Sequence, residues 1–265
     1  MPKIPEISNA EREAYEKNRD VTGELERMIK DSRRIVFFGG AGVSTESGIP
    51  DFRSADGIYS QKYGKLSPER IISRSFFDKA PGEFYDFYRD KLLYLDAKPN
   101  AAHKKLAELE AAGKDITIVT QNIDGLHQLA GSKKVIELHG SVLRNYCMKC
   151  YAEHSVEYIK NSKGVPYCMS PGCGGIVKPD VVLYEESLKS SDINGAVESI
   201  SNCDMLIIAG TSLVVYPAAG FVRYFRGKHS AIINLSASDR DSYMELVVHR
   251  KVGEVLGAIN VENCV

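Results

Sequence analysis

The sequence predicts an α/β doubly wound fold, in which a parallel β-sheet is covered by helices on both faces. Short, continuous apolar runs alternate with helical patterns through residues 35–140 and again through residues 190–260, as expected of strands that are buried on both faces. A glycine turn directly follows the first apolar run, a layout found in this fold class. Residues 141–180 interrupt the alternation and hold four of the six cysteines. We therefore divide the chain into a main domain, residues 1–140 and 181–265, and an inserted module, residues 141–180.

The individual elements follow from local patterns. Residues 8–31 are charged and amphipathic, which is typical of a helix. Short apolar runs predict buried strands at residues 35–38, 116–120, 135–138, 205–209 and 231–235. Two further helices are predicted at residues 81–97 and 100–112, and Gly113 would close the second of them as its C-cap.

The composition excludes several classes of protein. The chain has 265 residues, a net charge of −1, 43% hydrophobic residues and 26% charged residues, which is typical of a globular protein with a sizeable core. This charge argues against a strongly basic nucleic-acid scaffold, and the inserted module, with five basic and three acidic residues, is only mildly basic. We therefore expect no direct nucleic-acid binding. The N-terminal segment has no apolar signal region and cysteines are sparse, so we expect a cytoplasmic location with reduced thiols.

The uncharged stretch from Met205 to Val222 is long enough to be a candidate for a transmembrane helix. However, Gly210, Thr211, Ser212 and Pro217 interrupt it, whereas a membrane span is usually continuous. A buried strand, a polar turn and a helix starting near residues 215–217 explain the stretch better. We therefore expect no membrane partner.

The glycine turn after the first strand is a candidate phosphate site. It reads Gly40-Ala41-Gly42-Val43-Ser44-Thr45-Glu46-Ser47-Gly48-Ile49-Pro50-Asp51-Phe52-Arg53. A strand, a Gly-x-Gly turn and a helix start would bring backbone N–H groups to a pyrophosphate, and the hydroxyls of Ser44, Thr45 and Ser47 could bond phosphate. The spacing is not GxGxxG, and no acidic residue follows where a ribose ligand is expected. A simple tight turn therefore remains an alternative.

Polar residues follow the next two strands at the same edge of the predicted sheet. Gln121-Asn122-Ile123-Asp124 follows the strand at residues 116–120, and His139 follows the strand at residues 135–138. Amide and carboxylate groups there could fix a sugar or a carboxamide, and His139 could act as a general base. The alternatives are an Asx turn at Asp124 that caps the next helix, and a structural role for the histidine. His127 lies one helical turn past Ile123 and could be a neighbour.

The inserted module predicts a metal site. Its cysteines form two close pairs, Cys147-x2-Cys150 and Cys168-x4-Cys173, separated by seventeen residues. Two such pairs suit tetrahedral zinc, and four thiolates leave no open coordination position, so one structural Zn²⁺ is expected. The other reading, four unrelated buried thiols, fits the spacing less well. Cys203 and Cys264 lie outside the pattern.

Together these motifs resemble the sirtuins, which are NAD-dependent protein lysine deacylases, and in particular bacterial-type deacetylases. The resemblance rests on the stretches 40–53, 120–127, 139–141, 210–217 and 233–235 and on the four cysteines. It implies a Rossmann-type domain with a zinc-ribbon module, NAD as a consumed co-substrate and acetylated proteins or peptides as substrates. The acyl oxygen would attack C1′ of the nicotinamide ribose, nicotinamide would leave, and an alkylimidate would form. A ribose hydroxyl would then attack this intermediate, and water would release free lysine and 2′-O-acetyl-ADP-ribose. Nicotinamide would be a product and an inhibitor.

The resemblance also implies roles for individual residues. His139 would be the catalytic base, and Asn122 would join it in the catalytic site and contact ribose. The residues expected around NAD are Ala41, Thr45, Phe52, Arg53, Gln121, Asn122, Ile123, Asp124, Thr211, Ser212, Asn234, Leu235, Lys251 and Val252. Among them, Asp124 would accept a hydrogen bond from the carboxamide, and Phe52 would shield the ribose. Val182, Leu183 and Tyr184, with His139, would contact the substrate.

Two departures from the sirtuin pattern shape the expected specificity. The family usually has Phe-Gly-Glu where this chain has Tyr184-Glu185-Glu186. We expect the backbone to pair with peptide without a glycine there, and the Glu185 carboxylate to favour basic peptides. Members that remove succinyl groups carry Tyr-x-x-Arg, whereas here Tyr85 is followed by Tyr88, with Arg89 one position on. One residue turns a helical side chain by about 100°, so we expect neutral acyl groups. A mono-ADP-ribosyltransferase would use the same pocket, and a module that binds NAD or nucleic acid would show no turnover.

Overall fold

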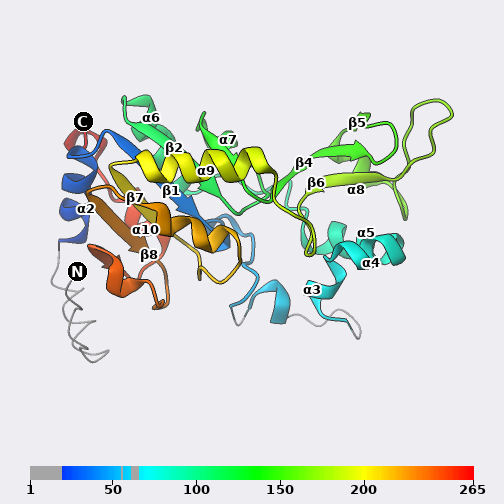
Figure 1. Ribbon diagram of the computed structural model, residues 1–265, viewed down its shortest axis with the longest axis horizontal. Helices are drawn as coiled ribbons and strands as arrows, with labels where there is room; N and C mark the ends of the chain where they lie inside the picture. The colour runs from blue at the N-terminus through cyan, green and yellow to red at the C-terminus, as the bar shows by residue number, and fades with distance from the viewer. Residues whose placement is uncertain (1–19, 55, 61–65) are drawn as a thin grey trace.

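The computed structural model describes residues 20–54, 56–60 and 66–265, which form a large and a small lobe (Figure 1). The large lobe is built on a parallel six-stranded sheet in the order β3-β2-β1-β7-β8-β9. Its strands are β1 (Arg34–Gly39), β2 (Asp115–Thr120), β3 (Val135–Glu137), β7 (Met205–Ala209), β8 (His229–Ile233) and β9 (Leu246–Val248). The order reverses between β1 and β7, which is the usual place for a ligand site in such sheets.

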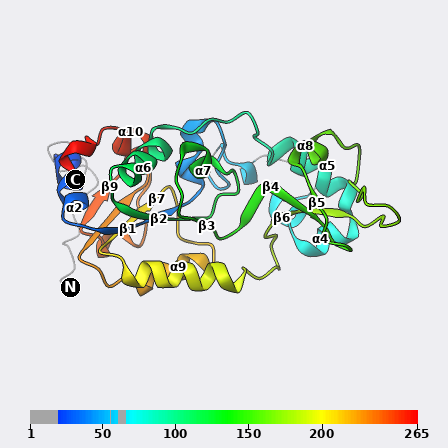
Figure 2. The same ribbon diagram turned by 90° about the horizontal axis from the view of Figure 1, so that it is seen from above.

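Helices cover both faces of this sheet, as predicted. Ile35 and Phe37 of β1 point into one apolar cluster, and Val36 and Phe38 point into another, because successive side chains of a strand face opposite ways. The first cluster is covered by α2 (Val21–Lys30), α6 (Ala101–Ala111) and α10 (Val252–Gly257). The second is covered by α9 (Ser190–Asn202) and the 3₁₀ helix η4 (Ala218–Tyr224). Figure 2 shows α9 along one side of the sheet and α6 and α10 on the other.

The N-terminal helix is only partly described. Residues 8–19 of the predicted helix lie outside the described residues, and α2 begins at Val21 after Asp20, whose carboxylate accepts a hydrogen bond from the Gly23 N–H. At its other end, the Lys114 ammonium donates to the carbonyls of Ile29 and Ser32 at 2.8 and 3.0 Å. A cation at this end complements the helix dipole, so Lys114 fixes α2 to the start of β2.

Two helix predictions need correction. The helix predicted at residues 81–97 ends earlier, because α5 spans Pro81–Lys91. Leu92, Leu93 and Leu95 beyond it pack against the small-lobe core from a non-helical path. The helix expected near residues 215–217 is the short η4, which starts only at Ala218 and is of the tighter 3₁₀ type. In both cases, the positions of the apolar residues are determined by tertiary packing and not by helical spacing.

The small lobe contains an antiparallel sheet in the order β5-β4-β6. Its elements are β4 (Gly140–Cys147), β5 (Glu153–His154), α8 (Val156–Asn161) and β6 (Val177–Val181). The helices α3 (Pro68–Ile71), α4 (Arg74–Lys79) and α5 lie at the same end of the molecule (Figure 1). Phe77 of α4 and Phe84 of α5 share an apolar cluster with Val142 and Val177 of this sheet. The division of the chain at residues 141 and 180 stays a prediction.

The chain crosses between the lobes at Gly140. Its φ is +77°, and a Cβ there would lie 1.8 Å from the Asp180 carbonyl oxygen, so glycine is required where β4 starts beside the end of β6. Within the described ranges, no helix is long and apolar enough to cross a membrane.

Candidate functional site

A cleft of about 1390 Å³ lies between the lobes at the carboxyl ends of β1, β2, β7 and β8. It brings together the residues that the sequence predicts for NAD and substrate. These lining residues are Ala41, Thr45, Phe52, Arg53, Gln121, Asn122, Ile123, Asp124, His139, Val182, Leu183, Tyr184, Thr211, Ser212, Asn234, Leu235, Lys251 and Val252. A cleft of this size fits an extended dinucleotide together with a side chain of a peptide.

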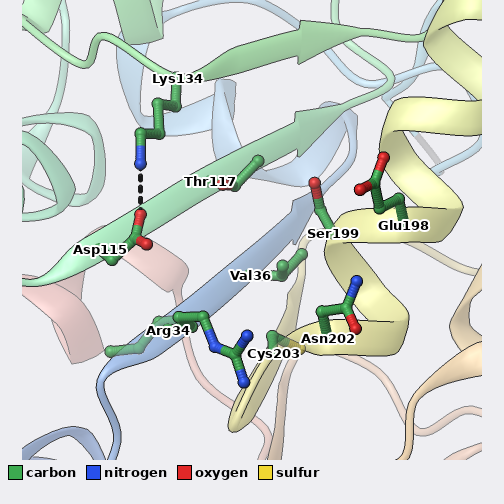
Figure 3. A pocket seen from close by; sticks show the side chains of 10 residues that line it. Arg34, Val36, Asp115, Thr117, Lys134, Glu198, Ser199, Asn202 and Cys203 are labelled. Atoms are coloured by element: carbon green, nitrogen blue, oxygen red, sulfur yellow. Dashed lines mark hydrogen bonds and ion pairs between the residues drawn. The ribbon is translucent and has the colours of Figure 1, made fainter.

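A smaller hollow of about 220 Å³ lies near the other ends of β1 and β2 (Figure 3). Its polar walls include the Lys134–Asp115 ion pair and Glu198 of α9. None of the predicted site residues lines it.

The glycine turn packs against a second turn that follows β7. The Gly42 N–H donates to the Gly210 carbonyl at 2.8 Å, and a Cβ on Gly42 would lie 2.8 Å from the Gly210 Cα. Gly210 has a φ of +60°. Glycine is thus required because two backbones meet here. The helix start predicted after the turn is instead two 3₁₀ turns, η1 (Ala41–Val43) and η2 (Thr45–Ser47).

The hydroxyls of this segment are engaged within the protein. Ser44 is buried, its Oγ donates to Asp124 Oδ2 at 2.6 Å, and it accepts from Asn122 Nδ2 at 3.0 Å. Ser47 Oγ accepts from Asn100 Nδ2 at 3.0 Å. Ser44 and Ser47 therefore have a different role from the predicted phosphate contact: they fix the turn and the Asp124 carboxylate. Thr45 Oγ1 donates to the Gly42 carbonyl and lines the cleft.

Asp124 both forms the Asx turn and lines the cleft, which were the two alternatives for this residue. Its Oδ1 accepts from the Leu126 N–H at 2.9 Å at the start of α7 (Leu126–Ala130), which is an Asx turn. Its Oδ2 accepts from Ser44, and the residue also lines the cleft. A carboxylate with both oxygens anchored is held in one orientation toward the cleft.

His139 is held as a neutral base. Its Nδ1 lies 2.9 Å from the Gln121 carbonyl oxygen, which can only accept, so Nδ1 carries the proton and Nε2 keeps its lone pair. Burial lowers the pKa of His139, and the hydrogen bond to Gln121 raises it to a smaller extent. The imidazole is therefore neutral at pH 7 and able to accept a proton.

His127, considered as a neighbour of the site, packs instead in the interior. Its ring lies 4.6 Å from that of His103 and 5.8 Å from that of Phe37, measured between centroids. Burial lowers the pKa of His127 well below its ordinary value. His127 is not among the residues that line the cleft.

Amide groups connect the ends of β2, β7 and β8. Gln121 Nε2 donates to Thr211 Oγ1 at 3.1 Å. Asn234 makes two bonds to the Thr211 backbone: its Oδ1 accepts from the N–H at 2.9 Å and its Nδ2 donates to the carbonyl at 3.1 Å. These bonds fix the polar turn after β7. Lys251 is the N-cap residue of α10, and Val252 is its first residue.

Sequence reasoning missed two supports of the site. Glu46 Oε2 accepts from the Gly253 N–H of α10 at 2.6 Å, which places a carboxylate at a helix N-terminus. Asn100 Nδ2 donates to the Val43 carbonyl at 2.7 Å while its Oδ1 caps α6 at the Ala102 N–H. Asn100 is the first residue of the helix predicted at residues 100–112, where asparagine is a typical cap, but its second bond depends on tertiary structure.

The predicted substrate segment, residues 182–185, follows β6. The N–H groups of Val182 and Tyr184 donate to the carbonyls of His139 and Ile72, both at 3.0 Å. Glu185 has a φ of +75°, so the backbone there is left-handed and not strand-like, at the position where the family usually has glycine. Pairing of this backbone with a peptide stays a prediction. The Glu185 carboxylate accepts from the Ser75 N–H and Oγ at 2.8 and 3.0 Å. It caps α4, which weakens the predicted attraction for basic peptides.

Glu186 anchors the same segment to the small lobe. It accepts from the Leu183 N–H at 2.9 Å, from Arg74 at 3.0 Å and from Lys178 at 3.1 Å. Burial raises the pKa of Glu186, but the Leu183 hydrogen bond and the charge of Lys178 outweigh it and lower the pKa below its ordinary value. Glu186 is therefore a carboxylate at neutral pH.

The predicted acyl preference, which stays a prediction, concerns the side chains of α5. Tyr88 is buried and lines the cleft, and the Tyr85 hydroxyl donates to the Val177 carbonyl. Arg89 donates to the Ile159 and Gly164 carbonyls at 2.9 and 2.5 Å. Its guanidinium is thus held by the small lobe and is not among the residues that line the cleft.

The four cysteines of the small lobe form one cluster. The Sγ atoms of Cys147, Cys150, Cys168 and Cys173 lie within 4.8 Å of one another. The Cys147–Cys173 and Cys150–Cys168 pairs are each 3.5 Å apart, close to the roughly 3.8 Å separation that Zn–S bonds of about 2.3 Å give in a tetrahedron. Backbone N–H groups of Lys149 and Ser170 point to two of the sulfurs, at 3.3 and 3.4 Å. The donors fit a structural zinc ion.

Comparison with known proteins agrees with this geometry. The model of the Sir2 family matches residues 40–217. An NAD-dependent protein deacetylase of Clostridium perfringens is 57% identical over 242 residues, which cover 91% of this chain and 98% of that protein. A counterpart in Cutibacterium acnes is 53% identical over 241 residues, which cover 90% and 98%. A solved Sir2 bound to an acetylated peptide is 38% identical, with a TM-score of 0.76, and covers 88% of this chain and 94% of that one. A solved complex of Sir2, a p53 peptide and NAD⁺ is 39% identical, with the same TM-score and coverage. This chain belongs to the Sir2 family.

Proposed function

We propose that this chain is an NAD-dependent protein lysine deacetylase in which His139 is the general base. The observation that carries the proposal is the single cleft, where a neutral imidazole stands between the nucleotide-side turns of the large lobe and the peptide-side segment of the small lobe. Curated relatives more than 50% identical over most of the chain are NAD-dependent protein deacetylases. Solved relatives hold acetylated peptide, NAD⁺ or acetylated ADP-ribose.

NAD supplies the activated C1′ of its ribose and leaves as nicotinamide and an acylated ADP-ribose. Asp124, with Ala41, Phe52 and Ile123, forms the proposed nicotinamide end of the cleft. The Asp124 carboxylate, fixed by Ser44 and Leu126, would accept from the carboxamide N–H. Phe52 would cover the reacting face and hinder the return of released nicotinamide. Nicotinamide that does return to this end of the cleft would act as an inhibitor.

The ribose, the phosphates and the adenosine of NAD would lie along the carboxyl ends of the strands of the large lobe. Gln121 and Asn122 lie beside His139 and are proposed to contact the ribose. Thr45, Arg53, Thr211 and Ser212 are proposed for the phosphates and nearby sugar, and Asn234, Leu235, Lys251 and Val252 for the adenosine end. The bonds among Gln121, Thr211 and Asn234 hold this surface in place before NAD arrives, which reduces the entropy lost on binding.

His139 would take a proton from a ribose hydroxyl. The Gln121 carbonyl fixes the Nδ1–H tautomer, so Nε2 is the atom that accepts the proton. The resulting imidazolium would be stabilised by the same carbonyl. A pKa lowered by burial keeps the base free of protons in neutral solution.

The acyl-lysine peptide would bind along residues 182–185. The N–H groups of Val182, Leu183 and Tyr184 are all bonded within the protein. We therefore assign pairing with the peptide to the Val182 carbonyl and the Glu185 N–H. Arg89 does not line the cleft, and Lys91, the α5 cation that does line it, pairs with Asp90 at 3.1 Å. This arrangement supports a preference for acetyl and similar neutral acyl groups. A nucleic-acid partner is not expected.

One assay that measures both nicotinamide release and the fate of labelled NAD tests the proposed function. Acetylated peptide and ¹⁴C-adenine-labelled NAD are mixed with the zinc-loaded protein, and each substrate is omitted in turn. We expect nicotinamide release only when both are present, with the label on a small acetylated nucleotide. Label transferred from NAD to protein would instead identify the mono-ADP-ribosyltransferase. Binding of NAD without release of nicotinamide would identify a binding module.

A further inference from the structure

Three side chains from different parts of the chain meet at the edge of the cleft. The Tyr184 hydroxyl, from the small lobe, lies 2.8 Å from the Tyr59 hydroxyl and accepts from Arg53 Nη2 at 3.4 Å. The Arg53 guanidinium in turn lies over the Tyr59 ring, 5.4 Å from its centroid. Arg53 and Tyr59 belong to the stretch on the proposed nucleotide side, whereas Tyr184 belongs to the proposed peptide segment.

Hydrogen bonds join the two ends of the stretch that carries Arg53 and Tyr59. This stretch comprises residues 51–54 and 56–59. The N–H groups of Ile58 and Tyr59 donate to the carbonyls of Asp51 and Phe52 at 2.8 and 2.9 Å. The Phe52 and Tyr59 rings pack with centroids 5.4 Å apart. A group that fixes the Tyr59 hydroxyl therefore also fixes the Phe52 ring, which is proposed to cover the reacting ribose.

Tyr184 itself is held from the other side by main-chain bonds. Its N–H donates to the Ile72 carbonyl at 3.0 Å, and its carbonyl accepts from the Arg74 N–H at 2.9 Å. Its neighbours Glu185 and Glu186 bind Ser75 and Arg74 at the start of α4. The ring of Tyr184 thus projects from a fixed backbone toward the Arg53–Tyr59 stretch.

We propose that the Tyr184 hydroxyl is a positioning group that couples the peptide segment to the Phe52 stretch, so that NAD binds to a cleft already shaped on the peptide side. This inference rests on the proposed function for its choice of ligands. Burial, and then the bond to Tyr184, raise the pKa of Tyr59 far above its ordinary value. The Tyr59 phenol is therefore neutral throughout an assay range of about pH 6 to 9.

The experiment removes single oxygen atoms. Tyr184→Phe and Tyr59→Phe keep both rings, and the double variant removes the whole pair. Tyr151→Phe is the matched control, because Tyr151 is an exposed tyrosine of the zinc module, 79% exposed, and does not line the cleft. The KM for NAD, the KM for acetylated peptide and kcat are measured for each protein, and melting temperatures verify folding.

We expect each single variant to raise the KM for NAD roughly 2- to 10-fold, the range that one net hydrogen bond supports. The double variant should be no worse than Tyr184→Phe, because Tyr184→Phe already removes the bond to Tyr59 together with the contact to Arg53. The kcat and the KM for peptide should change less than the KM for NAD, and Tyr151→Phe should match wild type. An unchanged KM for NAD in Tyr184→Phe, or additive effects in the double variant, would overturn the proposal. So would an effect confined to the KM for peptide.

A binding measurement separates this proposal from the proposed function. ADP-ribose is titrated calorimetrically into each protein, which needs no turnover. If wild type fails to deacetylate peptide but Tyr184→Phe still weakens ADP-ribose binding, the proposed activity fails and the coupling stands. If wild type deacetylates peptide and Tyr184→Phe changes neither ADP-ribose affinity nor the KM for NAD, the activity stands and the coupling is wrong.

Discussion

The two lobes are stabilised by different interactions. The large lobe has an apolar cluster on each face of its six-stranded sheet, and its polar groups gather at the carboxyl ends of the strands. The small lobe has a three-stranded sheet in which β5 has only two residues, and it adds α4, α5 and the four-cysteine cluster. This difference indicates that the nucleotide side of the cleft depends mainly on hydrophobic burial, whereas the peptide side adds the metal site and ion pairs to a smaller apolar cluster.

The largest effect is expected from loss of zinc. Cys150→Ser, or a strong chelator, should unfold the small lobe, because a structural zinc site is worth on the order of 10 kcal/mol, comparable to the whole stability of a domain. Metal content, far-UV circular dichroism and ADP-ribose binding measure the two lobes separately. We expect turnover to be lost while the large lobe still binds ADP-ribose. Full activity without zinc would contradict the structural role of the cysteines.

The next largest effect concerns the ion-paired peptide segment. Glu186→Gln should destabilise the protein by roughly 1.5–3 kcal/mol, the range for hydrogen bonds to charged groups, because its carboxylate serves Leu183, Arg74 and Lys178. The KM for acetylated peptide should rise while ADP-ribose affinity stays near wild type. The control is Glu198→Gln, an exposed carboxylate of α9 in the hollow of Figure 3. Equal effects on peptide and ADP-ribose would show that the lobes are not separable in this way.

A fall in pH should lower the stability of the large lobe. Burial lowers the pKa of His103 to about 4, although the nearby Asp124 charge raises it in part. The unfolded chain, with an ordinary histidine pKa near 6.5, therefore binds more protons below that pH, and stability falls between about pH 6.5 and 4. At pH 5 the loss from His103 should be about 2 kcal/mol, and His127 adds to it. Urea unfolding at pH 7 and 5, with His127→Phe as a comparison, measures this; equal stability at both pH values would contradict the account.

The smallest expected effect is on the selectivity between acetyl and succinyl groups. Wild type should deacetylate a peptide roughly ten times faster than it desuccinylates the same peptide, or more. A buried carboxylate without a paired cation is costly, and Lys91, the α5 cation that lines the cleft, already pairs with Asp90 at 3.1 Å. Arg89→Gln should leave this ratio unchanged, since the carbonyls of Ile159 and Gly164 hold the guanidinium. Rates on the matched acetyl- and succinyl-peptides decide the matter. Faster desuccinylation, or a ratio that depends on Arg89, would show that the cation reaches the acyl group.

The sequence predicted the large lobe better than the small one, for physical reasons. Buried parallel strands are continuous apolar runs, so β1, β2 and β7 were predicted within one or two residues. The cysteine spacing indicated the metal cluster, and the whole predicted set of cleft residues lines one cleft. Their roles toward NAD and peptide stay predictions.

Features that depend on tertiary contacts could not be read from the chain. Ser44 and Ser47 were expected to bond phosphate, but Asp124 and Asn100, far away in sequence, engage them. The left-handed backbone at Glu185 is set by the way residues 184–186 are tied to α4. The Tyr59–Tyr184 contact joins residues 125 positions apart, and no local pattern indicates it.

The central claim is that a neutral His139 works as the base between the two lobes. His139→Ala is assayed for deacetylation of an acetylated peptide and, by calorimetry, for NAD binding. We predict a loss of turnover of about 10²- to 10⁴-fold, the usual contribution of a general base, with NAD affinity close to wild type. Turnover equal to wild type in this variant would contradict the account.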